Sequence, residues 1–224
     1  MRKPETKQAP ALKHQEKGGD NMTIRLEKPE DWSQTEELTR EAFWNRYRPG
    51  CSEHYILHRY RRRPDFIKEL DYVIEESGQL VAHIMYSRSE ILQQKGGHLP
   101  SVTFGPVSVL PAFQGRGYGS SLIRFTLEKA RELGFGAVAI TGNPDYYHRF
   151  GFCSGQLLGI QYARAAQGEE TPFFMVRELI PGYLNGVAGT FTDPEGYDVD
   201  EQEVEAFDKR FPFKEKLRLP GQLI

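Results

Sequence analysis

The chain has 224 residues, a length that suits one compact domain with appendages and is short for two complete domains. With 38% hydrophobic residues and a formal charge of -2, it can bury a core but lacks the basic field of a nonspecific nucleic-acid binder. No apolar run approaches the roughly 18 residues of a membrane span, and the N-terminus has no apolar signal region. We therefore expect a cytoplasmic protein that binds neither nucleic acid nor membrane.

Cys51 and Cys153 are the only cysteines. Two cysteines are too few for a disulfide scaffold, and no metal-ligand spacing surrounds them, so we expect reduced, buried thiols and no metal. Residues 1–21 are polar and aperiodic, which is typical of a disordered leader.

The first third of the chain predicts a strand at Thr23–Glu27, a helix from Pro29 to about Trp44 and a second helix from near Ser52. The second helix ends in three arginines at 61–63. We interpret them as a solvated helix end, where cations also suit the helix dipole. The alternative is an anion site for a substrate or a cofactor phosphate.

A hairpin follows, with strands at Leu70–Glu75 and Leu80–Leu92 around a turn at 77–79. His83 lies in the second strand, and we expect it to be packed or hydrogen-bonded there. A further strand at Val102–Leu110 leads into a glycine-rich turn.

That turn, Gln114-Gly115-Arg116-Gly117-Tyr118-Gly119, stands directly before a long amphipathic segment. Free amides and the positive end of a helix dipole would point outward there, which favours an anion. The segment that follows predicts a helix capped by Gly134. Its apolar stripe is Leu122, Ile123, Thr126, Leu127, Ala130 and Leu133.

The remaining chain predicts a buried strand at Gly136–Thr141 and a short helix, capped by Asn143, that ends at Gly151. Strands at Gln156–Ala163 and Phe173–Leu179 are expected to form an antiparallel pair. A charged surface helix at Asp200–Phe211 would pack through Val204, Phe207 and Phe211.

Two common phosphate-binding designs fail on residue identity. A nucleoside-triphosphate loop needs Lys-Ser/Thr after its last glycine, but Ser120-Ser121 follow here without a lysine. A dinucleotide fingerprint needs G-x-G-x-x-G, and its third position is Ser120 or Leu122 in the two possible frames. A nicotinamide oxidoreductase is therefore disfavoured.

A third design fits. The Q-x-x-G-x-G turn, preceded by Gly105-Pro106-Val107-Ser108-Val109-Leu110-Pro111 and followed by Asn143-Pro144-Asp145-Tyr146-Tyr147-His148-Arg149-Phe150-Gly151-Phe152, resembles the GNAT superfamily of acyl-CoA-dependent N-acyltransferases. The closer likeness is to its bacterial YhbS-like branch. The resemblance is tight from Val102 to Phe152, follows the element order from Met22 to about Leu179, and covers the last segment weakly.

The resemblance implies an α/β (α+β) fold. A central mixed, mostly antiparallel sheet of about seven strands, with a splayed pair at the acyl-CoA site, would be flanked by helices. It also implies an acyltransferase domain at 22–180, with 181–224 as a C-terminal extension packed on the same domain.

The resemblance also implies a donor site for acetyl-CoA. The turn would hold the coenzyme A pyrophosphate, the strand backbone at Val107 and Val109 would pair with the pantetheine arm, and an N–H near Val109 would polarise the acyl carbonyl. Tyr147 matches the family tyrosine that protonates the departing thiolate. Asn143 matches a pantetheine contact loosely, and helix capping already explains it. The implied cofactor-binding residues are Val107, Ser108, Val109, Gln114, Gly115, Arg116, Gly117, Tyr118, Gly119, Ser120 and Asn143.

We therefore expect an N-acetyltransferase, an acyltransferase for groups other than amino-acyl groups, in which a primary amine of a small molecule or peptide attacks the thioester directly. The alternative is a non-catalytic acyl-CoA-binding sensor or scaffold. A homodimer is the default assembly.

The sequence does not identify the acceptor, because this fold hosts many acceptors. The aromatic residues around the first two helices either form a wall of the acceptor site or pack in the core. They are Phe43, Trp44, Tyr47 and Tyr55. The general base is left among Glu41, Glu75, Glu90 and His83.

Overall fold

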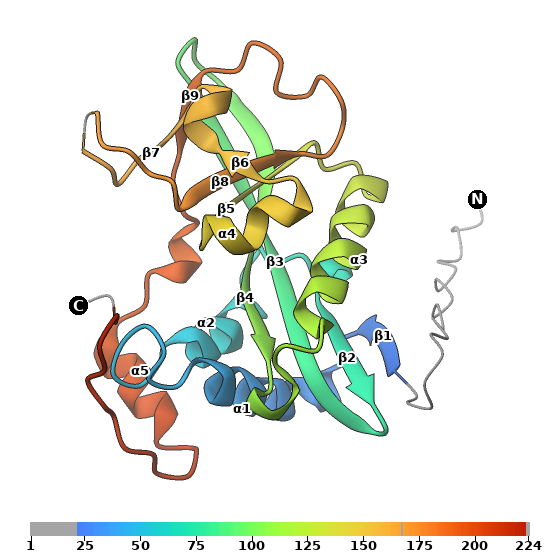
Figure 1. Ribbon diagram of the computed structural model, residues 1–224, viewed down its shortest axis with the longest axis vertical. Coiled ribbons are helices and arrows are strands. Elements are labelled where there is room, and N and C mark those ends of the chain that lie inside the picture. The colour runs from blue at the N-terminus through green and yellow to red at the C-terminus, as the bar shows by residue number, and fades with distance from the viewer. Residues whose placement is uncertain (1–21, 167, 223–224) are drawn as a thin grey trace, which may run out of the picture.

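The computed structural model of the chain describes residues 22–166 and 168–222, so the predicted leader at 1–21 lies outside the described residues. The described strands form one mixed sheet, ordered β1-β2-β3-β4-β5-β8-β6, and β7 and β9 join it beyond that path (Figure 1). The sheet thus has nine strands, where about seven were expected. The strands are β1 (Met22–Leu26), β2 (Tyr72–Glu76), β3 (Gln79–Gln93), β4 (His98–Val109), β5 (Ala137–Thr141), β6 (Cys153–Ser154), β7 (Ile160–Tyr162), β8 (Phe174–Glu178) and β9 (Gly189–Phe191).

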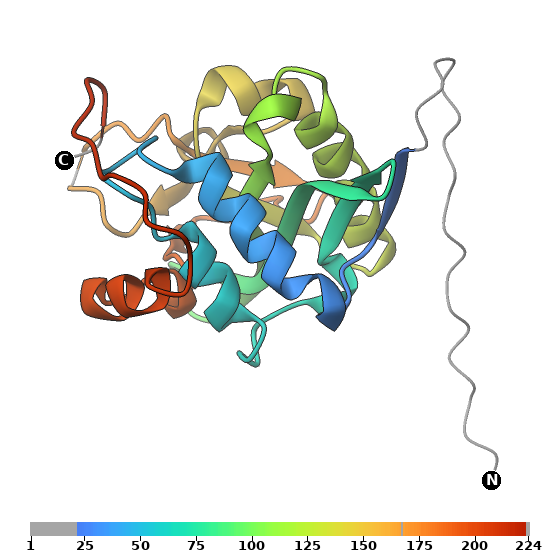
Figure 2. The ribbon, with the colours of Figure 1, turned by 90° about the horizontal axis from the view of Figure 1, so that it is seen from below.

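Helices cover both faces of this sheet (Figure 2). α1 (Trp32–Phe43) and α2 (Glu53–Tyr60) lie on one face, and α3 (Tyr118–Glu132) and α4 (Pro144–Tyr147) lie on the other. Successive strand residues point to opposite faces, so Val73 packs with α1 while its neighbour Ile74 joins the core under α3. The same alternation sends Met85 toward α2.

The predicted stripe of α3 forms most of the core on its face: five of the six residues are buried. Leu133 is the exception, with 50% of its surface exposed. It occupies the C-cap, where the chain turns away from the sheet, so the prediction of a sixth core residue was wrong. Gly134 confirms the predicted helix end with a left-handed φ of 86°.

The central strands diverge at the centre of the sheet. β4 pairs with β3 along its length, from Leu92↔His98 to Ala82↔Val109. With β5 it shares one residue pair among the described residues, Val102↔Val138. From residue 103 onward, β4 therefore separates from β5, which gives the expected splayed pair.

The expected antiparallel pair of 156–163 with 173–179 was wrong. The first stretch begins as a 3-10 turn (Gly155–Leu158), and its strand β7 pairs in parallel with β9. β8 instead pairs with β5 and β6. Packing between distant residues decides this arrangement, because Phe174 of β8 stacks on Phe191 of β9 with ring centroids 5.2 Å apart.

The C-terminal segment lies against α1 and α2 (Figure 2). α5 (Glu201–Asp208) buries Val204 and Phe207, as predicted, but it ends before Phe211, which is half-buried. Asp208 forms an ion pair with the buried Arg40 at 2.6 Å. Farther on, Lys214 pairs with Glu41 at 2.8 Å. Within the described residues, no helix is long and apolar enough to cross a membrane.

Candidate functional site

The glycine-rich turn between β4 and α3 opens onto solvent. Gly115 and Gly117 adopt left-handed backbone, with φ of 76° and 92°, and a Cβ on either would meet no atom within 4 Å. Gly117 is the N-cap of α3 and supplies no capping side chain, so the amides of the first turn face outward with the positive end of the helix dipole. The turn can therefore hold an anion such as a phosphate group.

Side chains around the turn divide between surface and core. Arg116 is exposed, and its guanidinium lies 5.2 Å from the ring centroid of Phe113. Tyr118 is buried and donates a hydrogen bond to the Glu76 carboxylate, so only its backbone borders the turn. Gly119 is also buried, and Ser120 is half-buried.

The end of β4 presents its backbone toward β5. Leu110 donates its N–H to Val81 of β3 at 2.9 Å, and groups alternate between the two sides along an antiparallel strand. Val109 and Val107 therefore direct their N–H and C=O groups away from β3, toward the splayed gap. The Gln114 amide donates to the Val109 carbonyl at 3.0 Å and ties the turn to this edge. The Ser108 hydroxyl instead points into the core, where it donates to Thr39 at 2.9 Å.

A cavity of about 320 Å³ adjoins the splay. One wall is the 103–106 stretch of β4, together with Thr141 at the end of β5. The other lining residues come from the α1–α2 region and from the C-terminal half of the chain: Phe43, Glu53, Ile56, Arg164, Asp193, Tyr197 and Asp198. The cavity thus lies beside the backbone edge described above.

Tyr147 stands at the end of α4, on the same side as the splay. The side chain of Asn143 accepts a hydrogen bond from the Asp145 amide at 3.0 Å, which confirms the predicted cap and fixes the start of the helix. The ring centroids of Tyr147 and Phe104 lie 6.0 Å apart. The Tyr147 ring also packs against Gly142, where an added Cβ would lie 2.5 Å from a ring carbon. Burial, with smaller effects of Tyr146 and Tyr47, raises the pKa of Tyr147, so its hydroxyl stays protonated at neutral pH.

Tyr146 reaches the glycine turn, a placement that the sequence did not reveal. Its ring packs on that of Phe150, with centroids 5.4 Å apart. Its hydroxyl, however, would lie 3.2 Å from a Cβ on Gly119, at the start of α3. The side chains of these two consecutive tyrosines thus point to different places, because adjacent helical residues differ by about 100° in direction.

The predicted aromatic wall is only partly present in the cavity. Phe43 lines it, and Tyr47 lies beside Phe43 with ring centroids 6.1 Å apart. Trp44 instead donates its indole N–H to the Glu215 carbonyl at 3.0 Å, and Tyr55 donates to Glu203 at 2.9 Å. These two residues bind the C-terminal segment.

None of the four predicted bases lines the cavity. Glu41 pairs with Lys214, Glu75 pairs with Arg25 at 2.9 Å, and Glu90 pairs with His98 at 2.7 Å. The carboxylate that does line it next to the helices is Glu53, at the start of α2. The sequence marks its position only locally, because Glu53 opens a helix directly after the turn at residues 48–50.

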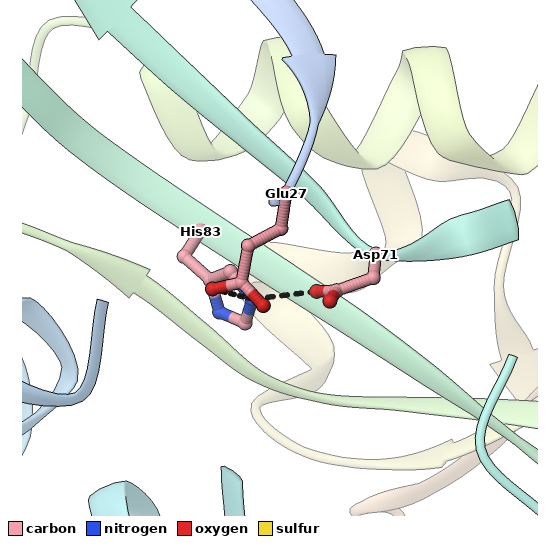
Figure 3. A group of neighbouring side chains, drawn as sticks. All are labelled: Glu27, Asp71 and His83. Carbon is pink, nitrogen blue, oxygen red and sulfur yellow. Dashed lines mark hydrogen bonds and ion pairs between the residues drawn. The ribbon is translucent and has the colours of Figure 1, made fainter. Parts of the chain in front are cut away.

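His83, the fourth candidate, is wholly buried on the α1–α2 face of the sheet. Figure 3 shows its ring pointing toward the carboxylates of Asp71 and Glu27. Its Nε2 lies 2.7 Å from Asp71 and 3.8 Å from Glu27, and one donor atom of each residue lies within 4.8 Å of the others. These three types of side chain can bind a metal ion.

Arg61 already supplies the positive charge to this group. Its guanidinium lies 2.7 Å from Glu27 and 2.7 Å from Glu36, and its side chain is 2% exposed. The interpretation of Arg61 as part of a solvated helix end was therefore wrong, because it is enclosed by Glu27, directly after β1, and by Glu36 of α1. A metal ion would have to displace this guanidinium, so we assign the group to buried ion pairing.

Replacing Asp71 by asparagine is expected to remove one contribution to the dependence of stability on pH. Burial, opposed by His83, raises the pKa of Asp71 from 3.8 to about 7. The folded state thus binds this proton more tightly, so its contribution is complete below pH 4 and is lost as pH rises through about 7. Urea unfolding should show the wild type losing stability relative to the Asp71→Asn variant as pH rises from about 4 to about 7, by at most about 1.4 kcal/mol per pH unit. An equal slope in both would contradict the assignment, and Asp145→Asn, an exposed site, is the control.

Cys51, His54 and Asp208 form a row that resembles a nucleophilic triad. The Cys51 thiol lies 3.4 Å from His54 Nδ1, and His54 Nε2 lies 3.1 Å from Asp208. Cys51 is 5% exposed and His54 is fully buried, and burial raises the pKa of the thiol. The row is therefore part of the packing, as expected for a buried thiol, whereas Cys153 is half-buried.

Comparison with known proteins gives a consistent result. Residues 23–154 match the family model described as an acetyltransferase (GNAT) domain. The chain is 28% identical over 169 residues to the uncharacterized N-acetyltransferase YhbS of Escherichia coli strain K12, across 75% of this chain and 93% of that protein.

Solved structures with this fold include two relatives of the chain. The Escherichia coli YhbS complex with CoA has a TM-score of 0.68 at 26% identity and covers 86% of this chain and 96% of its own. A GNAT family acetyltransferase from Brucella melitensis, in complex with acetyl-CoA, has a TM-score of 0.61 at 30% identity and covers 79% of this chain and 98% of its own.

Proposed function

Because the chain belongs to the GNAT acetyltransferase family, we propose that it transfers an acetyl group from acetyl-CoA to a primary amine by direct attack. The observation that carries this proposal is the alignment of three features: the open glycine turn, the exposed backbone edge of Val107 and Val109, and Tyr147 beside them. The CoA and acetyl-CoA complexes of the two structural relatives support a donor of this type.

The donor would lie along the splayed gap. The turn at Gln114–Gly119, with Ser120, would hold its pyrophosphate through backbone amides, because a Cβ at Gly115 or Gly117 would point into that space. Backbone groups of Val107 and Val109 would pair with the pantetheine arm in the manner of an added strand. The Val109 N–H would then stabilise charge on the carbonyl oxygen.

Tyr147 would donate the proton that the leaving sulfur needs. A phenol that remains protonated at neutral pH suits this role. Tyr146, with its hydroxyl at the start of α3, would instead contact the donor near the turn.

A thiol-release assay tests this function. Purified protein should release free thiol from acetyl-CoA at a rate that depends on an added amine, and mass spectrometry should detect the acetylated amine. Thiol release without amine dependence would indicate hydrolysis. Tight coenzyme A binding without release would favour the sensor or scaffold role over an enzyme.

The setting of the reaction is part of the same proposal. We retain the cytoplasm as the compartment, a small molecule or peptide as the acceptor, and a homodimer as the assembly. Light scattering on the purified chain measures the assembly directly.

A further inference from the structure

The cavity beside the splayed gap carries more negative than positive charge. Its charged lining residues are Glu53, Asp193, Asp198 and Arg164. Arg164 is already engaged, since its guanidinium lies 2.7 Å from Asp198 and 4.0 Å from Asp193. The lining therefore retains an excess of two negative charges, which favours a cationic ligand.

Glu53 differs from the other two carboxylates in having no ion pair within residues 22–166 and 168–222. Its carboxylate accepts a hydrogen bond from the Ser52 backbone N–H at 2.9 Å, which holds it at the start of α2. Burial raises the pKa of Glu53, while backbone hydrogen bonds and Arg48 oppose the rise. A carboxylate with a raised pKa is a stronger base than an exposed one.

The position of Glu53 is as informative as its charge. It shares the cavity with Phe104, Gly105 and Pro106 of β4, the stretch that leads directly to Val107 and Val109. A group bound in this cavity would therefore lie at the end of the gap that the donor's acyl group would reach. Glu53 is the carboxylate that α1 and α2 contribute to this lining.

We propose that this cavity is the acceptor site, that its acceptor is an amine carrying a second positive charge, and that Glu53 is the general base. This inference rests on the proposed acetyl transfer. Glu53 would remove the ammonium proton, and the pair of Asp193 and Asp198 would attract the distal cationic group.

The proposed acetyl transfer conserves atoms and charge. The acceptor enters as R–NH3+, and one proton passes to the Glu53 carboxylate and then to solvent. The nitrogen lone pair forms a C–N bond to the thioester carbon, and the C–S bond breaks. The sulfur takes a proton from Tyr147, which recovers one from the nitrogen. The products are the amide R–NH–CO–CH3, the free thiol and one proton in solvent.

Three four-carbon amines test the charge preference. The wild type should acetylate 1,4-diaminobutane with a kcat/KM about tenfold or more above that for 4-aminobutanoate, with 1-aminobutane between them. Equal values, or a preference for the carboxylate, would overturn the proposed acceptor class. Acetylation of none of the three, by a protein that acetylates another amine, would overturn the proposed acceptor class and leave the transferase function standing. Absence of acetylation with every amine tried, with coenzyme A still bound, would remove the transferase function as well.

Glu53→Gln tests the base. Its kcat with 1,4-diaminobutane should fall about 100-fold at pH 7, and the deficit should narrow toward pH 10, where the amine loses its proton unaided. Glu53→Asp should recover part of the activity, and Glu37→Gln, an exposed carboxylate on α1, should match the wild type. Calorimetry should give unchanged coenzyme A affinity, which excludes misfolding as the cause.

A role for Glu53 limited to capping α2 makes a different prediction. In that case the Glu53→Gln variant would have a lower thermal stability than the wild type, but its kcat would change with pH in the same way. That outcome, with normal acetylation by the wild type, would reject Glu53 as the base and leave the transferase function standing.

Discussion

Tyr147→Phe is expected to lower kcat about 100-fold and to leave coenzyme A affinity within about twofold. Loss of a general acid typically costs a factor of 10² to 10⁴, because the leaving thiolate must then depart without its proton. The ring would keep its contacts with Phe104 and Phe152, since the variant removes only the hydroxyl. Steady-state kinetics with acetyl-CoA and an amine, together with calorimetric titration of coenzyme A, measures both quantities.

Tyr146→Phe is the matched control for this prediction. It removes the neighbouring hydroxyl, which lies by Gly119 at the start of α3. We expect it to weaken coenzyme A binding slightly while turnover at saturating acetyl-CoA stays within a few fold of the wild type. If the two variants exchanged these effects, Tyr146 would be the acid and the assignment to Tyr147 would be wrong.

Gly117→Val is expected to weaken coenzyme A binding about tenfold or more, equivalent to at least about 1.4 kcal/mol. The glycine has a left-handed φ of 92°, and its missing Cβ faces open space at the turn. A valine side chain would occupy the volume proposed for the pyrophosphate. Calorimetry on the purified variant gives the dissociation constant.

Backbone strain is a competing explanation, because a β-branched residue in the left-handed region costs roughly 1–3 kcal/mol of stability. Gly134→Val separates the two effects. Gly134 has a similar φ of 86° and equally open surroundings, but it lies at the opposite end of α3. We expect both variants to lose similar thermal stability and only Gly117→Val to lose affinity. Equal affinity in both would remove the turn from the donor site.

The local elements of the proposed donor half could be predicted from sequence because their residues are close together in the chain. The glycine turn, the stripe of α3 and the Asn143 cap are local patterns, set by backbone freedom, helical period and capping. Each depends on neighbours only a few residues away. Their geometry follows from short-range chemistry, so a single sequence is sufficient to predict it.

The proposed acceptor half could not be predicted in the same way. The cavity combines Glu53 with residues 193–198, and only the folded sheet brings them together. The partner of β7 likewise depends on Phe174 meeting Phe191, a contact between separate segments. Arg61 illustrates the same limit. Three consecutive arginines are typical of a surface, but the carboxylates that enclose Arg61 come from distant positions, one directly after β1 and one on α1.

The ion pair between Arg40 and Asp208 makes the end of the chain part of the folding unit. Arg40 is 2% exposed on α1, and both oxygens of Asp208 accept hydrogen bonds from its guanidinium. Truncation before α5 would strand that cation in the protein interior, and removal of one partner from a buried pair costs roughly 3–5 kcal/mol. Such a loss is a large fraction of the free energy of unfolding of an ordinary domain. The C-terminal helix therefore contributes to the stability of the domain, and we expect a shortened protein that ends before Asp208 to unfold more readily.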